Sequence, residues 1–201
     1  MSEVIEQQLQ ILKKEGGPVT TAQIECAGIN RVMIPGLVEK GELIKERRGV
    51  YSFPEDFPDE FRTVQVNNPR VIYSYGTALY LWNMSDRLPH IWDVSVPQGF
   101  NATRLKKDHE TIRVHYVNSS KWKIGITETL TPEGSTVRLY DKERCMIDLI
   151  RGERKVSRQI FLQGVREYFK DQDNDRAKLI QYSRIFHVEG KVRTYMDILI
   201  G

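Results

Sequence analysis

The chain has 201 residues, of which 40% are hydrophobic and 28% charged, and its formal net charge is +3. These proportions are ordinary for a globular protein, and the length allows one large domain or two small ones. The sequence contains no run of about 18 apolar residues, and its N-terminus, MSEVIEQQLQ, is acidic and amphipathic rather than a basic leader. A membrane or secreted protein is therefore not predicted, and we expect a cytoplasmic one. The two cysteines, Cys26 and Cys145, lie far apart, which disfavours a disulfide framework or a cysteine-rich zinc site.

The first helix is predicted in residues 2–18. Val4, Ile5, Leu9 and Leu12 recur there at helical spacing, and two glycines and a proline end the pattern. A helix with one apolar face is the result.

Two shorter helices are predicted to follow. Thr20 and Gln23 fit a capping box at the start of the second helix, and Gly28 is suited to end it. Asn30 is suited to cap the third helix, which Gly41 would end. The inward face of the third helix is formed by Ile34, Leu37 and Val38. Two helices joined so tightly predict a helix-turn-helix.

The stretch ELIKERRGVYSF, residues 42–53, predicts a hairpin. ELIKE and VYSF form the two strands, with Arg47, Arg48 and Gly49 at the tip, where glycine allows the positive φ of a tight turn. Its anchors to the domain are Val50, Tyr51 and Phe53. Three helices followed by a basic-tipped hairpin predict a winged helix.

A winged helix of this kind binds DNA with its third helix in the major groove and its wing on the phosphates. The candidate DNA contacts in this domain are Thr20, Thr21, Asn30, Arg31, Lys40, Lys45, Arg47 and Arg48. The alternative is a protein-interaction module whose charged hairpin is simply solvated. The net charge of the domain supports this alternative: residues 1–54 carry seven basic and seven acidic side chains, whereas DNA-binding domains commonly carry a basic excess. Pro35 leaves two forms of the third helix open: it begins near Ile34, or it is bent.

The proline-rich, acidic stretch at 54–61 predicts a domain boundary, giving a winged helix-turn-helix at 1–54 and an α/β domain at 55–201. The second domain is predicted to be a mixed α/β domain, in which a sheet is followed by a helical C-terminal layer. Its first helix should carry Ile72, Tyr75, Leu79 and Trp82 on one face. The strand candidates are residues 90–97, 111–117, 123–130 and 135–140. The later helices are expected at 141–152, where Asp141 is the cap, at 156–169, where Ile160, Val165 and Phe169 face inward, and in two stretches parted near Glu189 and Gly190.

Residues 104–123 form the densest basic stretch in the chain. Its candidate DNA contacts are Arg104, Lys106, Lys107, Arg113, Lys121 and Lys123, against Asp108 and Glu110. A second run contributes Arg151, Arg154, Lys155 and Arg158. These side chains could extend the DNA-binding surface, receive RNA or an acidic partner, or simply protect a solvated strand edge.

The sequence shows no recognisable arrangement of catalytic or metal-binding residues, so no catalytic residue, metal or cofactor is predicted. The four histidines are scattered, and no glycine-rich phosphate loop occurs. Asp141 and Glu143 fit a helix start, where the dipole favours acids. Asp175 and the Glu-Gly-Lys at 189–191 superficially match a nuclease, although they are predicted between helices rather than on strands.

In the order of these features the chain resembles the AbiEi-type antitoxins. These are bacterial transcriptional regulators of type IV toxin–antitoxin systems, which act in phage defence by abortive infection. The matching positions are Gly49, Val50, Tyr51, Ser74, Ala78, Leu79, Leu88, Pro89, Val96, Pro97, Asp141, Arg144, Asp148 and Leu149. The resemblance covers the whole chain in order, and Pro35 departs from the family's third helix.

The resemblance implies an autorepressor whose winged helix binds inverted repeats in its own promoter. It also implies a functional partner, a nucleotidyltransferase-like toxin opposed without a stable complex. We expect a monomer in solution that pairs on DNA half-sites. The alternatives are a one-component regulator, which needs a closed apolar ligand pocket, and a DNA-targeted nuclease.

Overall fold

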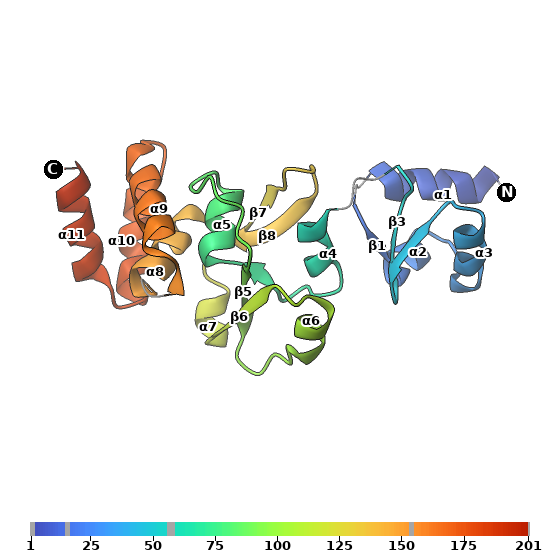
Figure 1. The fold of residues 1–201 in the computed structure, drawn as a ribbon, viewed down its shortest axis with the longest axis horizontal. Helices are drawn as coiled ribbons and strands as arrows, with labels where there is room; N and C mark the ends of the chain where they lie inside the picture. The colour runs from blue at the N-terminus through green and yellow to red at the C-terminus, as the bar shows by residue number, and fades with distance from the viewer. Residues whose placement is uncertain (1–2, 15–16, 56–58, 153–154, 201) are drawn as a thin grey trace. The chain divides into compact units, whose positions relative to one another are not determined.

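The computed structural model describes residues 3–14, 17–55, 59–152 and 155–200 (Figure 1). The chain divides into two compact units: residues 1–69 with 130–137, and residues 70–129 with 138–201. The first is a winged helix-turn-helix, and the second combines a sheet with a helical C-terminal layer, so the predicted mixed α/β class is confirmed.

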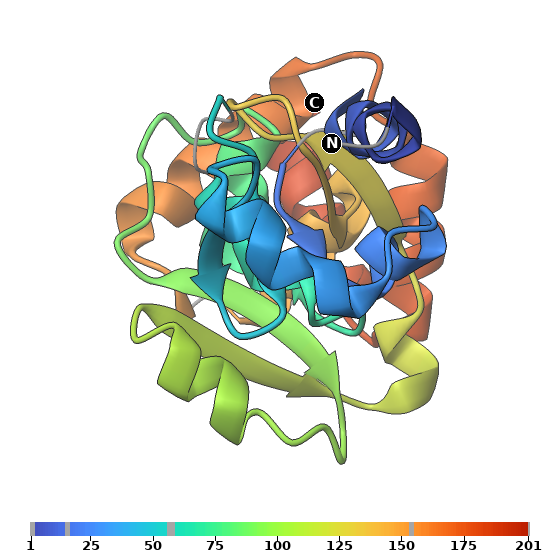
Figure 2. The ribbon, with the colours of Figure 1, turned by 90° about the vertical axis from the view of Figure 1, so that its right-hand side faces the viewer.

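The first unit opens with the helices predicted from the sequence (Figure 2). They are α1 (Glu3–Lys14), α2 (Thr21–Cys26), a 3₁₀ turn (Arg31–Met33) and α3 (Ile34–Glu39). The capping box is present: Thr20 Oγ1 accepts from the Gln23 backbone N–H at 3.1 Å, and Thr20 N donates to Gln23 Oε1 at 2.9 Å. Leu9 and Leu12 are buried as predicted, whereas Val4 is 59% exposed, because helical rotation turns it away from the core.

The third helix takes the first of the two forms left open by Pro35. Asn30 caps the 3₁₀ turn by accepting from Val32 N, and α3 then begins at Ile34 with Pro35 in its first turn. A proline is tolerated there because the first turn leaves its backbone N–H groups unpaired in any case. The result is a short helix of six residues in which Ile34 and Leu37 are buried.

The wing forms a three-stranded antiparallel sheet in the order β1-β3-β2. Its strands are β1 (Val19–Thr20), β2 (Ile44–Arg47) and β3 (Val50–Ser52). Gly49 turns the tip with φ +77°, and its carbonyl accepts from Thr21 N at 3.1 Å, which joins the tip to the start of α2. Val50 and Phe53 are buried and Tyr51 is half-buried, so the predicted anchors are confirmed. Arg47 lies in β2 rather than in the turn.

The first compact unit extends past residue 54 and includes α4 (Glu60–Val66), which is hydrogen-bonded to the wing. Arg47 Nη2 donates to the Thr63 carbonyl of this helix. Asp59 caps α4 and accepts from Thr131 Oγ1 at 2.6 Å, which explains why residues 130–137 belong to the same unit.

The second unit is built on a five-stranded sheet in the order β6-β5-β4-β8-β7. The strands are β4 (Ile72–Tyr73), β5 (Trp92–Pro97), β6 (Ile112–Val117), β7 (Ile126–Leu130) and β8 (Thr136–Tyr140). The helical prediction for Ile72 is wrong, because this residue pairs with Ser95 in the neighbouring strand. α5 (Tyr75–Leu81) begins only after Ser74. β6 is parallel to β5 and forms an edge of the sheet, and α6 (Thr103–Asp108) lies in the crossover between them.

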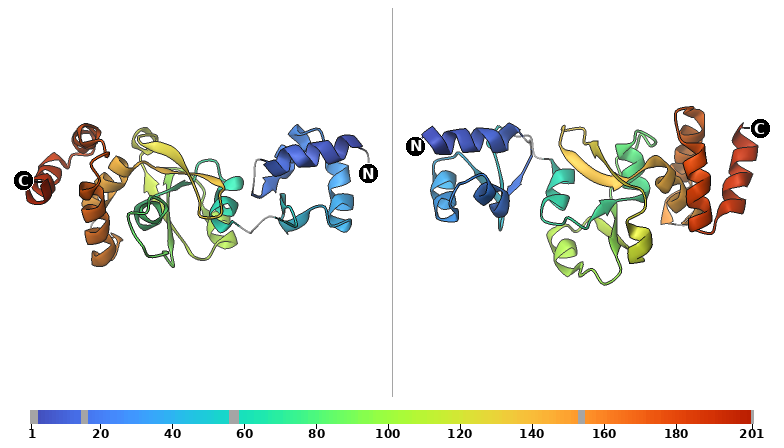
Figure 3. Two further views of the ribbon diagram at one scale, coloured as in Figure 1. Left: turned by 90° about the horizontal axis from the view of Figure 1, so that it is seen from above. Right: turned by 180° about the vertical axis from the view of Figure 1, so that it is seen from behind.

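The described residues of the second unit contain five further helices (Figure 3). They are α7 (Ser119–Trp122), α8 (Lys142–Arg151), α9 (Arg158–Lys170), α10 (Arg176–Ile185) and α11 (Glu189–Ile200). Asp141 caps α8 as predicted by accepting from Arg144 N at 2.7 Å. Val165 and Phe169 are buried and Ile160 is half-buried on α9. The last two helices part at residues 186–188, and Glu189 begins α11.

Candidate nucleic-acid interface and a cationic pocket

The outer face of the 3₁₀ turn and α3 combines one cation with apolar side chains. Arg31 is exposed, Val32 is 83% exposed and Met33 is 42% exposed, while Lys40 lies exposed where α3 ends. In a major groove, arginine can pair with a guanine edge or a phosphate, and apolar side chains can meet thymine methyl groups. This face therefore has the chemistry of a short recognition helix.

The wing presents fewer free cations than the sequence predicts. Lys45 and Arg48 are exposed, and Arg48 occupies the turn itself. Arg47 is half-buried with its guanidinium bonded to the Thr63 carbonyl, and the Thr20 hydroxyl is engaged in the capping box. Thr21 donates its backbone N–H to the wing tip. The exposed predicted cations of this unit are Arg31, Lys40, Lys45 and Arg48.

The basic stretch at 104–123 is not a single strand edge. Arg104, Lys106 and Lys107 lie on α6, Arg113 lies on β6, and Lys121 and Lys123 lie at α7. Figure 1 shows α6 and α7 at opposite ends of β6. A six-residue strand is about 17 Å long, so the stretch forms two separate basic clusters.

Arg113 is turned towards the neighbouring strand and the C-terminal layer. Its Nη1 donates to the Lys155 carbonyl at 3.0 Å and lies 3.6 Å from Asp93 Oδ1. His115, two residues further along β6, places Nε2 2.7 Å from the same oxygen. Arg113 thus holds β6 in place, which reduces its availability to a phosphate.

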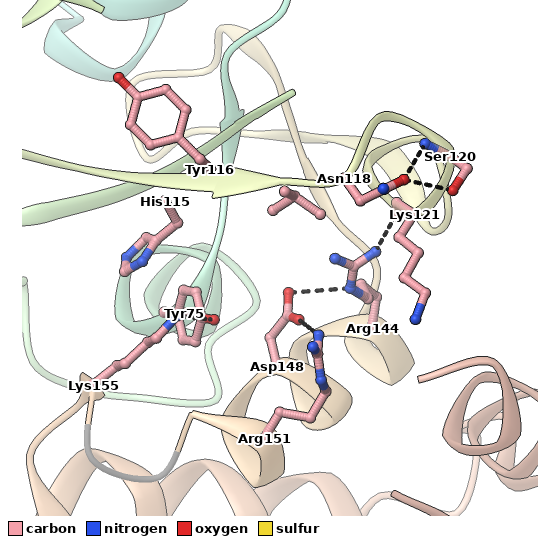
Figure 4. Close-up of a pocket in the computed structure, with 11 residues that line it drawn as sticks. Tyr75, His115, Tyr116, Asn118, Ser120, Lys121, Arg144, Asp148, Arg151 and Lys155 are labelled. Atoms are coloured by element: carbon pink, nitrogen blue, oxygen red, sulfur yellow. Dashed lines mark hydrogen bonds and ion pairs between the residues drawn. The ribbon is translucent and has the colours of Figure 1, made fainter. Parts of the chain in front are cut away.

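A pocket of about 360 Å³ lies between β6, α7 and α8 in the second unit (Figure 4). Arg144, Asp148 and Arg151 line it from one face of α8, because residues four and seven apart in a helix share a face. Sequence reasoning did not predict this pocket. Arg144 was singled out only by the family resemblance, whereas Asp148 was also noted among the acids crowded at the start of this helix; the spacing of the two residues along the helix was visible in the sequence.

Arg144 is fully buried and joins several elements. Its Nε donates to Asp148 Oδ2 at 3.1 Å, and its Nη1 donates to the carbonyls of Lys121 and Ile124 at 2.8 and 2.9 Å. Burial raises the pKa of Asp148 above its ordinary value, and the positive charge of Arg144 acts in the opposite direction. The two bonds from Arg144 Nη1 to backbone carbonyls fix the loop after α7 against α8, while the ion pair with Asp148 orients the guanidinium.

The pocket differs from the one that a ligand sensor was expected to contain. Its wall is mainly charged and polar rather than apolar. Arg151 and Lys155 of the second basic run contribute to it, whereas Arg154 lies outside the described residues. Arg158 begins α9.

The nuclease-like acids have structural partners. Asp175 caps α10 by accepting from Lys178 N at 2.8 Å. Glu189 accepts from Arg184 at 3.2 Å and from Arg193 at 2.8 Å. Within the described ranges, no group of three or more His, Cys, Asp or Glu side chains could hold a metal. Nor is any helix in the described part of the chain long and apolar enough to cross a membrane.

Comparisons with known proteins agree with this arrangement. The sequence model of the family described as "Transcriptional regulator, AbiEi antitoxin" matches residues 6–54, which run from α1 to the end of the wing. The solved structure of the RV2827C protein from Mycobacterium tuberculosis is similar in fold: the TM-score is 0.56 at 13% identity, over 90% of this chain and 70% of that one. No curated protein sequence matches.

Proposed function

We propose that the whole chain is the antitoxin and autorepressor of a type IV toxin–antitoxin operon, because residues 6–54 match the family model described as "Transcriptional regulator, AbiEi antitoxin". The observation that carries the proposal is the winged helix itself, which the family match covers from α1 to the wing. On this proposal the protein is cytoplasmic and acts by binding rather than by catalysis.

The DNA-binding step follows from the exposed side chains of the first unit. The 3₁₀ turn and α3 enter the major groove of an inverted-repeat promoter, where Arg31, Val32 and Met33 meet base edges. Arg48 at the wing tip contacts a phosphate of the adjoining backbone, and Lys45 supports it. Arg47 acts indirectly, because its bond to the Thr63 carbonyl fixes the wing on α4.

A gel-shift titration on the chain's own promoter tests the regulator. We expect preference for that promoter over random DNA at moderate salt. Arg48→Gln should weaken binding to both DNAs by a similar factor of about 10, since a phosphate contact carries no sequence information. Arg31→Gln should reduce the preference itself.

Lys14→Gln is the matched control for that titration, because it removes an exposed cation of α1, outside α3 and the wing. It should leave binding unchanged. Equal affinity of the unaltered protein for promoter and random DNA would refute the proposed repressor.

The antitoxin step is proposed to be indirect. The partner is a nucleotidyltransferase-like toxin, and the chain opposes it without forming a stable complex. The chain alone should elute from a sizing column as a monomer and pair cooperatively only on adjacent half-sites. An elution profile in which toxin and antitoxin travel together as one species would contradict this step.

A further inference from the structure

The cationic pocket of the second unit carries more positive charge than its own carboxylate balances. Four of its lining residues are cationic, namely Lys121, Arg144, Arg151 and Lys155, and one is acidic, Asp148. Asp148 is paired with Arg144, and Arg151 Nη1 lies 3.9 Å from its other oxygen. The pocket thus holds three cations in excess, which is the condition for binding an anion of more than one charge.

One buried nitrogen in the pocket wall has no partner. Arg144 Nη2 makes no hydrogen bond within the described structure, although the Nε and Nη1 of the same guanidinium are fully engaged. The rings of Tyr140 and Phe186 hold the group between them, with centroids 4.1 and 4.2 Å from Cζ. Figure 4 shows this third nitrogen on the side of the guanidinium that faces the pocket.

A buried N–H without an acceptor is costly, so native structures rarely leave one unpaired. The nitrogen is buried, and a small side-chain movement of the kind common on binding would let a ligand oxygen reach it. Guanidinium groups favour phosphate and carboxylate oxygens as partners.

The opposite wall is formed by a strained aromatic residue. Tyr75 has φ +46°, a left-handed conformation that is rare for an aromatic residue and that tends to occur at functional sites. Lys155 Nζ donates to its hydroxyl at 3.2 Å, and its ring lies 4.3 Å from that of His115. Burial, followed by the charge of Asp148, raises the pKa of Tyr75, so its hydroxyl remains a proton donor.

We propose that this pocket binds a small molecule bearing a phosphate group, with Arg144, Lys155 and the Tyr75 hydroxyl around the phosphate. A pocket of about 360 Å³ falls within the range of small-molecule sites and exceeds what inorganic phosphate fills. The Tyr75–His115 ring pair provides a surface for the organic part of the ligand. This inference does not depend on DNA binding or on the toxin.

Calorimetric titration of the full chain with adenosine monophosphate, inorganic phosphate and adenosine tests the proposal. We expect saturable binding of the first two at one site, and none of adenosine. Lys155→Gln should weaken both by about tenfold or more, because it removes a charge-assisted contact. Asp148→Asn should instead strengthen binding, since it removes the competing negative charge and keeps an acceptor for Arg144.

Lys170→Gln, on α9 and with a side chain 75% exposed, is the matched control and should bind as the unaltered chain does. The proposal is overturned if neither phosphate nor adenosine monophosphate binds. It is also overturned if Lys170→Gln weakens binding as much as Lys155→Gln, or if adenosine binds as tightly as its monophosphate. Binding of a 5′-phosphorylated oligonucleotide without binding of the small probes would assign the pocket to nucleic-acid ends instead.

Discussion

Gly125 takes a left-handed backbone conformation, with φ +80°, directly beside Arg144. A Cβ added to Gly125 would lie 2.7 Å from the Arg144 Cβ and 3.1 Å from Asp141 Oδ1. The Gly125 carbonyl also accepts from Asp141 N at 2.7 Å, which ties the loop to the start of α8. The position therefore needs glycine both for its backbone angle and for the close approach of the buried arginine.

Gly125→Ala should destabilise the chain by about 2–4 kcal/mol, because it combines backbone strain with overpacking. Gly99 is the matched control: its φ is +84°, and no atom lies within 4 Å of an added Cβ. Gly99→Ala should cost only about 1 kcal/mol. Urea unfolding of both variants provides the comparison, and equal losses would show that the contact with Arg144 does not matter.

The Glu189 carboxylate bridges the end of α10 and the first turns of α11. Glu189 accepts hydrogen bonds from Arg193 and Arg184, and these bonds lower its pKa below the ordinary value of 4.5. A carboxyl whose pKa is lower in the folded chain stabilises the fold above its unfolded pKa. That stabilisation is lost as the pH falls through the folded value.

Glu189→Gln should therefore lower the thermal midpoint slightly at neutral pH. The difference from the unaltered chain should shrink as the pH falls below about 4.5, where the unfolded carboxyl is also protonated. The effect is small because the group is exposed to solvent. Thermal unfolding from neutral to acidic pH measures it, and a difference that stays constant with pH would argue against the ion pairs as its source.

Elements set by local chemistry were predictable from the sequence, and those set by distant partners were not. The caps at Thr20, Asn30 and Asp141 each depend on residues two or three positions away, and all three are present. Ile72 and Tyr73 stand in an apolar run in which helix and strand patterns look alike. Their strand pairing is decided by β5 and β8, which lie far along the chain.

The candidate sites divide in the same way. The winged helix and its exposed cations follow from a continuous stretch of sequence. The pocket depends on Arg144 meeting the carbonyl of Lys121, 23 positions earlier, and on Lys155 meeting Tyr75, 80 positions earlier. Hydrogen bonds between residues so far apart in the sequence leave no local pattern, so only the folded structure reveals them.

At the scale of the whole molecule, the distribution of charge decides how DNA binding would depend on salt. Residues 1–54 carry equal numbers of basic and acidic side chains, whereas residues 104–123 carry six Lys or Arg against two acids. Lys106 and Lys107 are exposed on α6 and suited to phosphate contact. The proposed repressor would then rely on the second unit for part of its affinity.

The double variant Lys106→Gln/Lys107→Gln should reduce the slope of log affinity against log salt by about 1.8, because each lost phosphate contact accounts for about 0.9. Filter binding to the promoter between about 50 and 200 mM salt measures the slope. Lys170→Gln, the exposed α9 control, should leave it unchanged. An unaltered slope in the double variant would show that Lys106 and Lys107 of α6 make no phosphate contacts.

The first compact unit is assembled from two stretches of chain, residues 1–69 and 130–137. A ribosome makes the chain from its N-terminus at roughly 5–20 residues per second, so several seconds pass between the two stretches. Throughout that interval the Asp59 carboxylate lacks Thr131, its later partner at 2.6 Å. Although residues 1–54 are synthesised before the second unit, the compact unit that contains them is therefore completed only after residues 70–129 have been made.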